Sequence, residues 1–265
     1  MKTTGNLHTD DLLEGWQLAD LLCSTYGQPA YVCLGHVGPD NASIVSLGNW
    51  TGGKPDEPSL APFIAHGKMG ELLCYGKSEG LSLTPVPDIG EIGFGWMGGA
   101  RYDKDIVAVS QWHQEHDRLL ALIVLYSLQY SFYPHDIYLH HVGFRHESEV
   151  AARAAAEARG ECLEMPAKDH LRWYHCVEDS QLPHGKFYIE DQFFPEGPQT
   201  PAFHWDLITQ DPIKFLTFVA EAYGMEPKFW EAGENDPVGL VWITAKKDSS
   251  VMGIMARTRF WEVEA

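Results

Sequence analysis

The sequence predicts an α+β fold whose C-terminal part, residues 136–265, is a tandem of two βαβββ units that together form a cupped sheet. The main observation is a repeat, because the order strand, helix, glycine and three short strands occurs twice. The two helix ends overlay at a constant offset, since 224 − 160 = 64, and the segments 156–160 and 220–224 share four of five residues. The segment 1–135 shows no such repeat, so it is expected to form a separate α+β domain of uncertain topology.

In the N-terminal part, the clearest prediction is a helix over residues 10–26. Leu12, Trp16, Ala19 and Leu22 recur there at helical spacing, and Gly27 follows as a stop signal. We expect strands at residues 31–34, 43–47 and 71–75, turn-rich loops at 51–58 and 84–88, and a helix that passes into a strand over 105–128.

The C-terminal units follow from their apolar patterns and turn residues. The first is expected to comprise a strand at 137–144, a helix at 147–159 and strands near 161–165, 171–177 and 186–192. The second is expected to comprise a strand at 202–209, a helix at 212–223 and strands near 228–231, 239–244 and 251–258. Gly160 and Gly224 follow the helices, where a left-handed cap favours a residue without a Cβ. Two such units side by side would place both first strands at the centre of a cup. Catalytic or ligand-binding residues are therefore expected on these two strands.

Composition excludes several classes of function. The chain has 37 acidic and 19 basic side chains and a formal net charge of −18, which disfavours binding to nucleic acids and to anionic membrane surfaces. The longest apolar stretch, Leu119 to Tyr126, is too short to cross a bilayer. Five cysteines without a C-x-x-C pair argue against a disulfide framework, and the N-terminal segment lacks an apolar run of signal-peptide length, so we expect a cytoplasmic protein.

Histidines on both expected first strands form the candidate site. The strand at 202–209 carries His204, the strand at 137–144 carries His140 and His141, and the strand at 186–192 carries Glu190. Two imidazoles and one carboxylate that face one cavity can hold Zn²⁺, Fe²⁺, Mn²⁺ or Ni²⁺ and leave positions open for a substrate.

The choice between His140 and His141 depends on which argument is weighted. The offset favours His140, since 204 − 64 = 140. Strand alternation favours His141, because placing His141 in the cup sends Val142 and Phe144 toward the helix as an apolar face. We rank the packing argument higher and predict His141, with one residue fewer in the following turn.

Residues 136–260 resemble the vicinal oxygen chelate superfamily, which includes glyoxalases, extradiol dioxygenases and bleomycin-resistance proteins. The strings that carry the resemblance are His141-Val-Gly-Phe, Ala-Arg-Gly160, His204-Trp-Asp-Leu-Ile-Thr-Gln-Asp-Pro212 and the helix from Phe215 to Met225. The resemblance implies metal ligands on the first and last strands of each unit, which are His141, Glu190 and His204 in this chain. The fourth position would fall at 251–258, where the sequence has no carboxylate.

Further residues are expected at the site. Glu262, just beyond the last strand, is the nearest carboxylate and is expected to shuttle a proton as a catalytic residue. The residues expected to bind the substrate are Tyr188, Trp205, Asp206 and Trp242.

Three functions are compatible with these residues. The first is a metal-dependent isomerase, lyase or dioxygenase that acts on a small oxygen-bearing substrate. A homodimer is the candidate assembly for such an enzyme. The second is a metal-free protein of the same fold that sequesters a flat cationic compound, which nine tryptophans and the negative charge would suit. The third is an acidic inhibitor or immunity protein for a basic partner, motivated by the charge alone.

Overall fold

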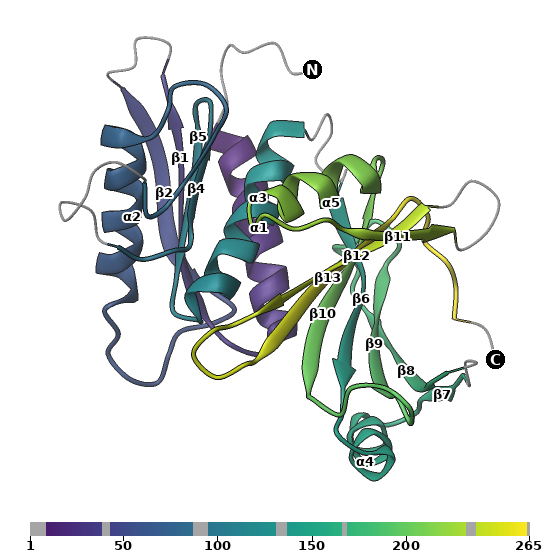
Figure 1. Ribbon diagram of the computed structural model, residues 1–265. Coiled ribbons are helices and arrows are strands. Elements are labelled where there is room, and N and C mark those ends of the chain that lie inside the picture. The colour runs from purple at the N-terminus through teal and green to yellow at the C-terminus, as the bar shows by residue number, and fades with distance from the viewer. Residues whose placement is uncertain are drawn as a thin grey trace. The chain divides into compact units, whose positions relative to one another are not determined.

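The computed structural model describes residues 9–38, 43–86, 95–130, 137–165, 169–231 and 237–263. The chain divides into two compact units, Met1–Pro134 and His135–Ala265 (Figure 1). The α+β prediction is confirmed, since the described residues form five helices and two sheets of five and eight strands. None of the helices in these ranges is long and apolar enough to span a membrane.

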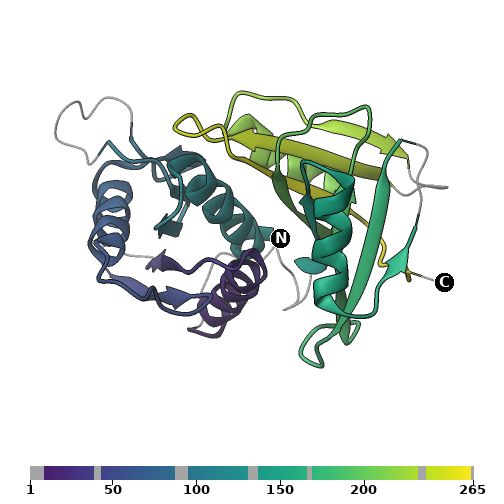
Figure 2. The same ribbon diagram turned by 90° about the horizontal axis from the view of Figure 1, so that it is seen from below.

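The N-terminal unit is an antiparallel sheet with helices on both faces. Its elements are α1 (Thr9–Tyr26), β1 (Ala30–Val37), β2 (Ile44–Thr51), α2 (Ala61–Tyr75), β3 (Leu81–Leu83), β4 (Gly99–Tyr102), β5 (Asp105–Ser110) and α3 (Gln114–Tyr130). The strand order is β2-β1-β5-β4-β3, and every neighbouring pair is antiparallel. Helix α2 lies on one face of the sheet, while α1 and α3 pack together on the other (Figures 1 and 2).

Two predictions in this unit are wrong. Residues 71–75 are the last turn of α2 and not a strand, because Ala61, Ala65, Met69 and Leu72 are buried at helical spacing through that segment. The segment 105–128 has the reverse order, with strand β5 first and helix α3 second. All six residues of β5 are buried, so the strand shows no alternation, and acidic residues in the first turn of α3 mark where the helix begins.

The C-terminal unit contains the repeat that the sequence predicts. Its first half is β6 (Ile137–Arg145), α4 (Glu149–Arg159), β7 (Leu163–Glu164), β8 (Leu171–Glu178) and β9 (Lys186–Phe193). Its second half is β10 (Ala202–Thr209), α5 (Pro212–Glu221), β11 (Lys228–Glu231), β12 (Pro237–Thr244) and β13 (Val251–Arg257). Both helices start at a side-chain cap, because Ser148 accepts a hydrogen bond from the Ala151 N–H and Asp211 accepts one from the Lys214 N–H.

The two halves join into one sheet through their first strands. The strand order is β11-β12-β13-β10-β6-β9-β8-β7, with β6 and β10 antiparallel at the centre. Each first strand is parallel to the last strand of its own half, β6 to β9 and β10 to β13. Helix α4 covers β8 and β9 through Ala152, Ala156 and Trp173, and α5 covers β10, β12 and β13. The opposite face of the sheet is left for the site.

Candidate metal site and its cavity

Three side chains converge from the central strands of the C-terminal sheet. His141 is on β6, Glu190 on β9 and His204 on β10, and β6 lies between the other two strands. Gly143 of β6 pairs with Glu190 on one side and with His204 on the other. Since Gly143 has no side chain, the His204 ring can lie across β6. A Cβ atom at residue 143 would be 1.9 Å from the His204 Cε1 atom.

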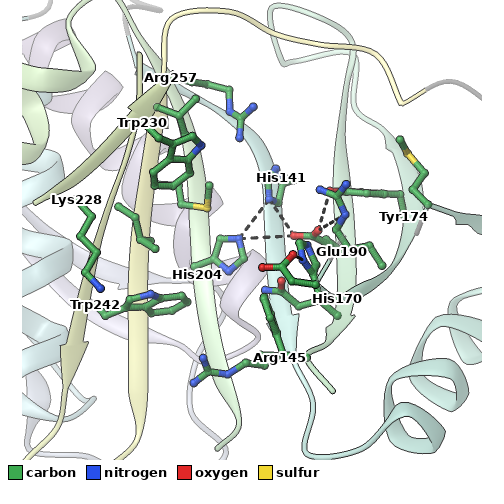
Figure 3. A pocket seen from close by; sticks show the side chains of 18 of the residues that line it. His141, Arg145, His170, Tyr174, Glu190, His204, Lys228, Trp230, Trp242 and Arg257 are labelled. Atoms are coloured by element: carbon green, nitrogen blue, oxygen red, sulfur yellow. Dashed lines mark hydrogen bonds and ion pairs between the residues drawn. The ribbon is translucent and has the colours of Figure 1, made fainter. Parts of the chain in front are cut away.

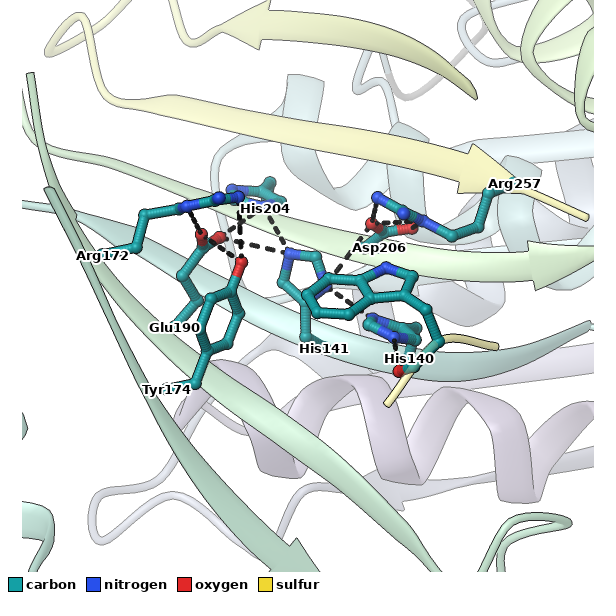
Figure 4. Close-up of polar contacts among 9 residues, drawn as sticks. His140, His141, Arg172, Tyr174, Glu190, His204, Asp206 and Arg257 are labelled. Carbon is teal, nitrogen blue, oxygen red and sulfur yellow. Dashed lines mark hydrogen bonds and ion pairs between the residues drawn. The ribbon is translucent and has the colours of Figure 1, made fainter. Parts of the chain in front are cut away.

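The three functional groups are close together and buried. The His141 Nε2 atom is 3.2 Å from the His204 Nε2 atom and 3.2 Å from the Glu190 Oε2 atom. The His204 Nε2 atom is 3.8 Å from the same Glu190 oxygen (Figure 4). All three residues are at most 4% exposed. The structure thus brings together the three ligands that the sequence analysis proposed.

Neighbouring side chains hold Glu190 in its charged form. The Tyr174 hydroxyl donates a 2.7 Å hydrogen bond to Glu190 Oε1, and the Arg172 guanidinium lies 3.9 Å from the same oxygen. Burial alone would raise the pKa of Glu190, but the adjacent His141 and His204 side chains and the Tyr174 hydrogen bond outweigh burial and hold this pKa below its usual range. Burial lowers the pKa of His204 to about 4, so its ring is neutral near pH 7.

A second histidine sets the proton position on His141. The His140 Nε2 atom is 3.0 Å from the Trp261 carbonyl oxygen, which can only accept, so His140 carries its proton on Nε2. Burial, followed by the neighbouring His141, lowers the pKa of His140 to about 3, so its Nδ1 atom is an acceptor. The His141 Nδ1 atom, 2.8 Å away, therefore donates to it. This assignment leaves the lone pair of His141 Nε2 for the point where His204 and Glu190 converge.

Both neighbouring histidines lie on the same side of the sheet because β6 is irregular. The pairing of β6 with β10 shifts register between Asp206 and Leu207, which pair with His141 and Leu139 respectively. His140 is therefore an extra residue, a β-bulge in β6. Regular alternation would point one of the two histidines to the helix side, and this expectation is wrong because of the bulge.

The donor set fits a divalent transition metal. Two ring nitrogens bound to one tetrahedral ion at about 2.1 Å are about 3.4 Å apart, and the two Nε2 atoms here are separated by 3.2 Å. Two facing lone pairs repel each other, so only a proton or a cation between them makes this approach favourable. Two imidazoles and a carboxylate suit Zn²⁺, Fe²⁺, Mn²⁺ or Ni²⁺. A second group of residues also has ligand atoms close enough together to hold one metal ion, namely His140, His141 and Asp206. It shares His141 with the first group.

Asp206 lies behind His141 and not in the cavity. It is fully buried and accepts two hydrogen bonds from the Arg257 Nε atom, at 2.9 and 3.1 Å. Its Oδ2 atom is 3.4 Å from His141 Nδ1. The substrate-binding role expected for Asp206 is therefore replaced by a supporting one, because its oxygens are already bound by protein groups (Figure 4).

The trio lies at the wall of a cavity of about 1010 Å³ that is built entirely from the C-terminal unit (Figure 3). Tryptophans from β11, β12 and the C-terminal segment line it, namely Trp230, Trp242 and Trp261, and so do apolar residues of β12 and β13. Arg145, Arg172, Lys228 and Arg257 supply positive charge. A cavity of this size holds a small organic molecule.

Several residues expected at the site lie elsewhere. Glu262 is half-exposed and bound to Lys186 and to the Tyr188 hydroxyl, and it does not line the cavity. Tyr188 is buried beneath the C-terminal segment and does not line it either. Trp205 is fully buried, and alternation with His204 places it on the face that the helices cover. Of the four expected substrate-binding residues, only Trp242 lines the cavity.

The strand expected to carry a fourth ligand offers a glycine. Gly253 of β13 pairs with His204 on one side and with Trp242 on the other. A Cβ atom at Gly253 would be 2.4 Å from the Trp242 ring, so the indole lies directly over this glycine. The Trp242 ring thus occupies the side of His204 on which the resemblance would place a fourth ligand.

Sequence reasoning missed the groups that support the ligands. Tyr174 and Arg172 are on β8, where they share the cavity face with Glu190 across the pairing of Tyr174 with Glu190. Alternation along residues 171–177 could have placed these two residues on one face, opposite Trp173. The offset of 64 marked His140 only as an alternative ligand, and alternation marked neither its supporting role nor that of Arg257, because a bulge and a pairing between distant strands bring them to the site.

Comparisons with known proteins identify no family. No family model matches the chain, and no curated protein matches it. Four solved chains match in structure. One of them is a substituted form of 4-hydroxymandelate synthase from Streptomyces coelicolor, which is 12% identical, with a TM-score of 0.32 over 95% of this chain and 91% of that one. A superposition of that quality does not define a shared fold.

Proposed function

We propose that this chain is a metal-dependent enzyme of the vicinal oxygen chelate type that acts on a small oxygen-bearing molecule. The observation that carries the proposal is the convergence of His141, Glu190 and His204 on one point at the wall of a large cavity. The tandem βαβββ arrangement supports it, because both first strands lie at the centre of the sheet, as the resemblance of residues 136–260 implies.

The side chains around the trio prepare it to hold a cation. Tyr174 and Arg172 keep the Glu190 carboxylate charged and oriented, and His140 directs the His141 lone pair. A bound divalent ion would supply Lewis-acid stabilisation of charge on the substrate oxygens. The trio lies at the wall of the cavity, and the tryptophans that share this lining would reduce contact of a bound substrate with water.

A proton carrier is available in the cavity wall, in place of Glu262. His170 lines the cavity, and its Nδ1 atom is 2.6 Å from the Asp169 carboxylate. Its ring stacks on Phe194 with centroids 4.5 Å apart, which fixes its orientation. We assign His170 the role of general acid and base, since an imidazole held by a carboxylate can take up and release a proton. Isomerase, lyase and dioxygenase chemistry all remain compatible with these groups.

Metal analysis of the purified protein tests the proposal. We expect about one first-row transition metal ion per chain, and loss of this ion in His204→Ala and in Glu190→Gln. A matched control is His175→Ala, because His175 is on β8 beside Tyr174 but binds the Glu161 carbonyl instead of lining the cavity. Wild-type protein that binds none of Zn²⁺, Fe²⁺, Mn²⁺ and Ni²⁺ would refute the metal site and favour a metal-free binding protein.

A further inference from the structure

The charge of the cavity is opposite in sign to that of the chain. The whole chain has 37 acidic and 19 basic residues, whereas the cavity is lined by four basic residues, Arg145, Arg172, Lys228 and Arg257, and by two acidic ones, Asp169 and Glu190. A local excess of positive charge on an acidic protein attracts an anion specifically to this place. The bound metal proposed above would add to this excess.

Two of these arginines are placed to bind an oxyanion. Arg257 is set aside, because its charge is already paired with the buried Asp206 carboxylate. Arg172, Gln192 and Arg145 form one row across β8, β9 and β6, since Gln192 pairs with Arg172 on one side and with Arg145 on the other. Neighbouring strands are about 4.8 Å apart, so the backbones of the two arginines lie on either side of Gln192, and all three side chains line the cavity.

The hydrogen-bonding capacity of this row is not used up by the protein. The Arg172 guanidinium donates one hydrogen bond, from Nη1 to the Tyr174 hydroxyl at 3.3 Å, while its buried Nε atom lies 3.9 Å from Glu190 Oε1 and has no hydrogen-bond partner among the described residues. The Nε atom of Arg145 donates to the Thr200 carbonyl, and its guanidinium lies over the Trp242 ring at 5.5 Å, which positions it at the cavity wall. Planar guanidinium groups bind carboxylates and phosphates through paired hydrogen bonds.

Apolar side chains gather on the β12 and β13 side of the cavity, which Lys228 and Arg257 also line. Val238, Leu240, Val251 and Met255 line it from β12 and β13, together with Trp230 and Trp242, while the polar row lies on the β6, β8 and β9 side. Figure 3 shows Trp230 and Trp242 on the opposite side of the trio from Tyr174. The trio therefore borders both the apolar side chains of β12 and β13 and the row of Arg172, Gln192 and Arg145.

We propose that the ligand of this cavity is an amphiphilic acid, with a flat apolar body against Trp242 and Leu240 and a carboxylate or phosphate group at the row of Arg172, Gln192 and Arg145. This deepens the proposed function by naming a substrate class, and it places the anionic group on the arginines and not on the metal. An anionic ligand also takes the place of the cationic compound considered from the sequence, because the net negative charge of the whole chain does not extend into the cavity.

Four naphthalene compounds that differ in charge test this proposal. Naphthoate, naphthyl phosphate, naphthamide and naphthylmethylamine share the same ring, and their affinities are measured by calorimetry or ligand-observed NMR with the full chain. The measurement is made with metal-free protein, prepared with a chelator, so that binding of the anion to a metal does not contribute. We expect one of the two anions to bind at least about tenfold more tightly than the amide, and the amine to bind most weakly.

Arginine variants locate the anion. Arg145→Gln and Arg172→Gln should each weaken the preferred anion about tenfold while leaving the amide unchanged, and Arg145→Lys should restore part of the loss. The control is Arg153→Gln, an equal change of charge on α4, outside the cavity. Preference for naphthoate or for naphthyl phosphate distinguishes a carboxylate from a phosphate.

The outcomes separate this proposal from the metal site. Equal affinity for all four compounds, preference for the amine, or undetectable binding of both anions would overturn the acid-binding proposal, whatever the metal content. An anion preference that depends on Arg145 and Arg172 would support it even in protein that binds no metal, in which case only the proposed metal chemistry would fail.

Discussion

The imidazole ring of His204 lies against the backbone of Gly143, at a distance that no side chain at residue 143 would permit. A Cβ atom there would approach the three ring atoms Cε1, Nε2 and Nδ1 of His204 to 1.9, 2.5 and 2.6 Å. Because Gly143 has no side chain, the His204 ring can occupy the position that brings it next to His141 and Glu190.

Gly143→Ala is expected to weaken metal binding at least tenfold, roughly as loss of a supporting contact does, because the methyl group would push His204 away from His141 and Glu190. The measurement is metal content and affinity of the purified variant. Gly70→Ala is the control, since a Cβ at Gly70 in α2 meets nothing within 4 Å. Full metal binding by Gly143→Ala would show that His204 is not held by this contact.

Removal of the His140 ring should weaken metal binding while leaving the ligands in place. In His140→Ala, the His141 Nδ1 proton loses its acceptor 2.8 Å away, so the ring is free to rotate or to carry its proton on Nε2. We expect a loss of about 10- to 100-fold in metal affinity. His140→Gln, whose side-chain oxygen can accept the same proton, should recover part of it. Identical affinities for both variants would argue that His140 only fills space.

Asp206→Asn is expected to destabilise the C-terminal unit. The change removes the negative charge that faces Arg257 in a buried position, and an uncompensated buried charge costs roughly 3–5 kcal/mol. Urea unfolding of each variant measures the free energy. The double variant Asp206→Asn with Arg257→Gln should be more stable than the single one, because no charge is then left unpaired. A double variant that is less stable by the sum of both single losses would contradict this.

The N-terminal unit should show a pH-dependent stability that depends on Asp117. Burial, partly offset by Lys68, raises the pKa of Asp117 from 3.8 to about 7. Since the folded-state pKa is the higher one, the stabilising contribution is fully present below pH 3.8 and is lost as the pH rises to about 7. The free energy of unfolding of the wild type should therefore fall over this range relative to Asp117→Asn.

A second variant checks the cause of this pH dependence. The Lys68 Nζ atom is 3.3 Å from Asp117 Oδ2, and its charge lowers the pKa of Asp117. In Lys68→Met the fall in stability should extend to higher pH, because that opposing charge is gone. The same pH profile in both proteins would mean that the charge of Lys68 does not lower the pKa of Asp117.

Removal of the metal should lower the melting temperature. An ion that binds only the folded chain at a hundred times its dissociation constant contributes about 2.7 kcal/mol. Differential scanning calorimetry with and without a chelator measures the shift. His204→Ala should melt at the same temperature in both conditions, and a chelator effect of equal size in that variant would place the ion elsewhere.

The elements of the C-terminal unit were predictable because their signals are local. Apolar alternation marks β8, β9 and β10, and the glycines after α4 and α5 have positive φ angles of 107° and 63°. The repeat then orders these elements and places both first strands at the centre. In the N-terminal unit, a segment of five residues such as 71–75 was too short to reveal that it continues a helical pattern.

Alternation also predicted which faces carry His204 and Glu190, since β9 and β10 are regular at these residues. It did not predict His140, because the bulge in β6 exists only in the pairing with β10. The offset of 64 residues and the alternation disagreed about His140 and His141 for this reason, and both histidines lie on the cavity side.

The amino-acid sequence alone determined the α+β class, the two repeated units and the strands that carry the three proposed ligands, because each of these depends on periodicity within one segment. Only the tertiary structure decided that Asp206 is paired with Arg257, that Glu262 lies away from the cavity and that the cavity wall is cationic. These properties arise from contacts between strands that are distant in the chain, and the register of those contacts is set by packing of the whole sheet.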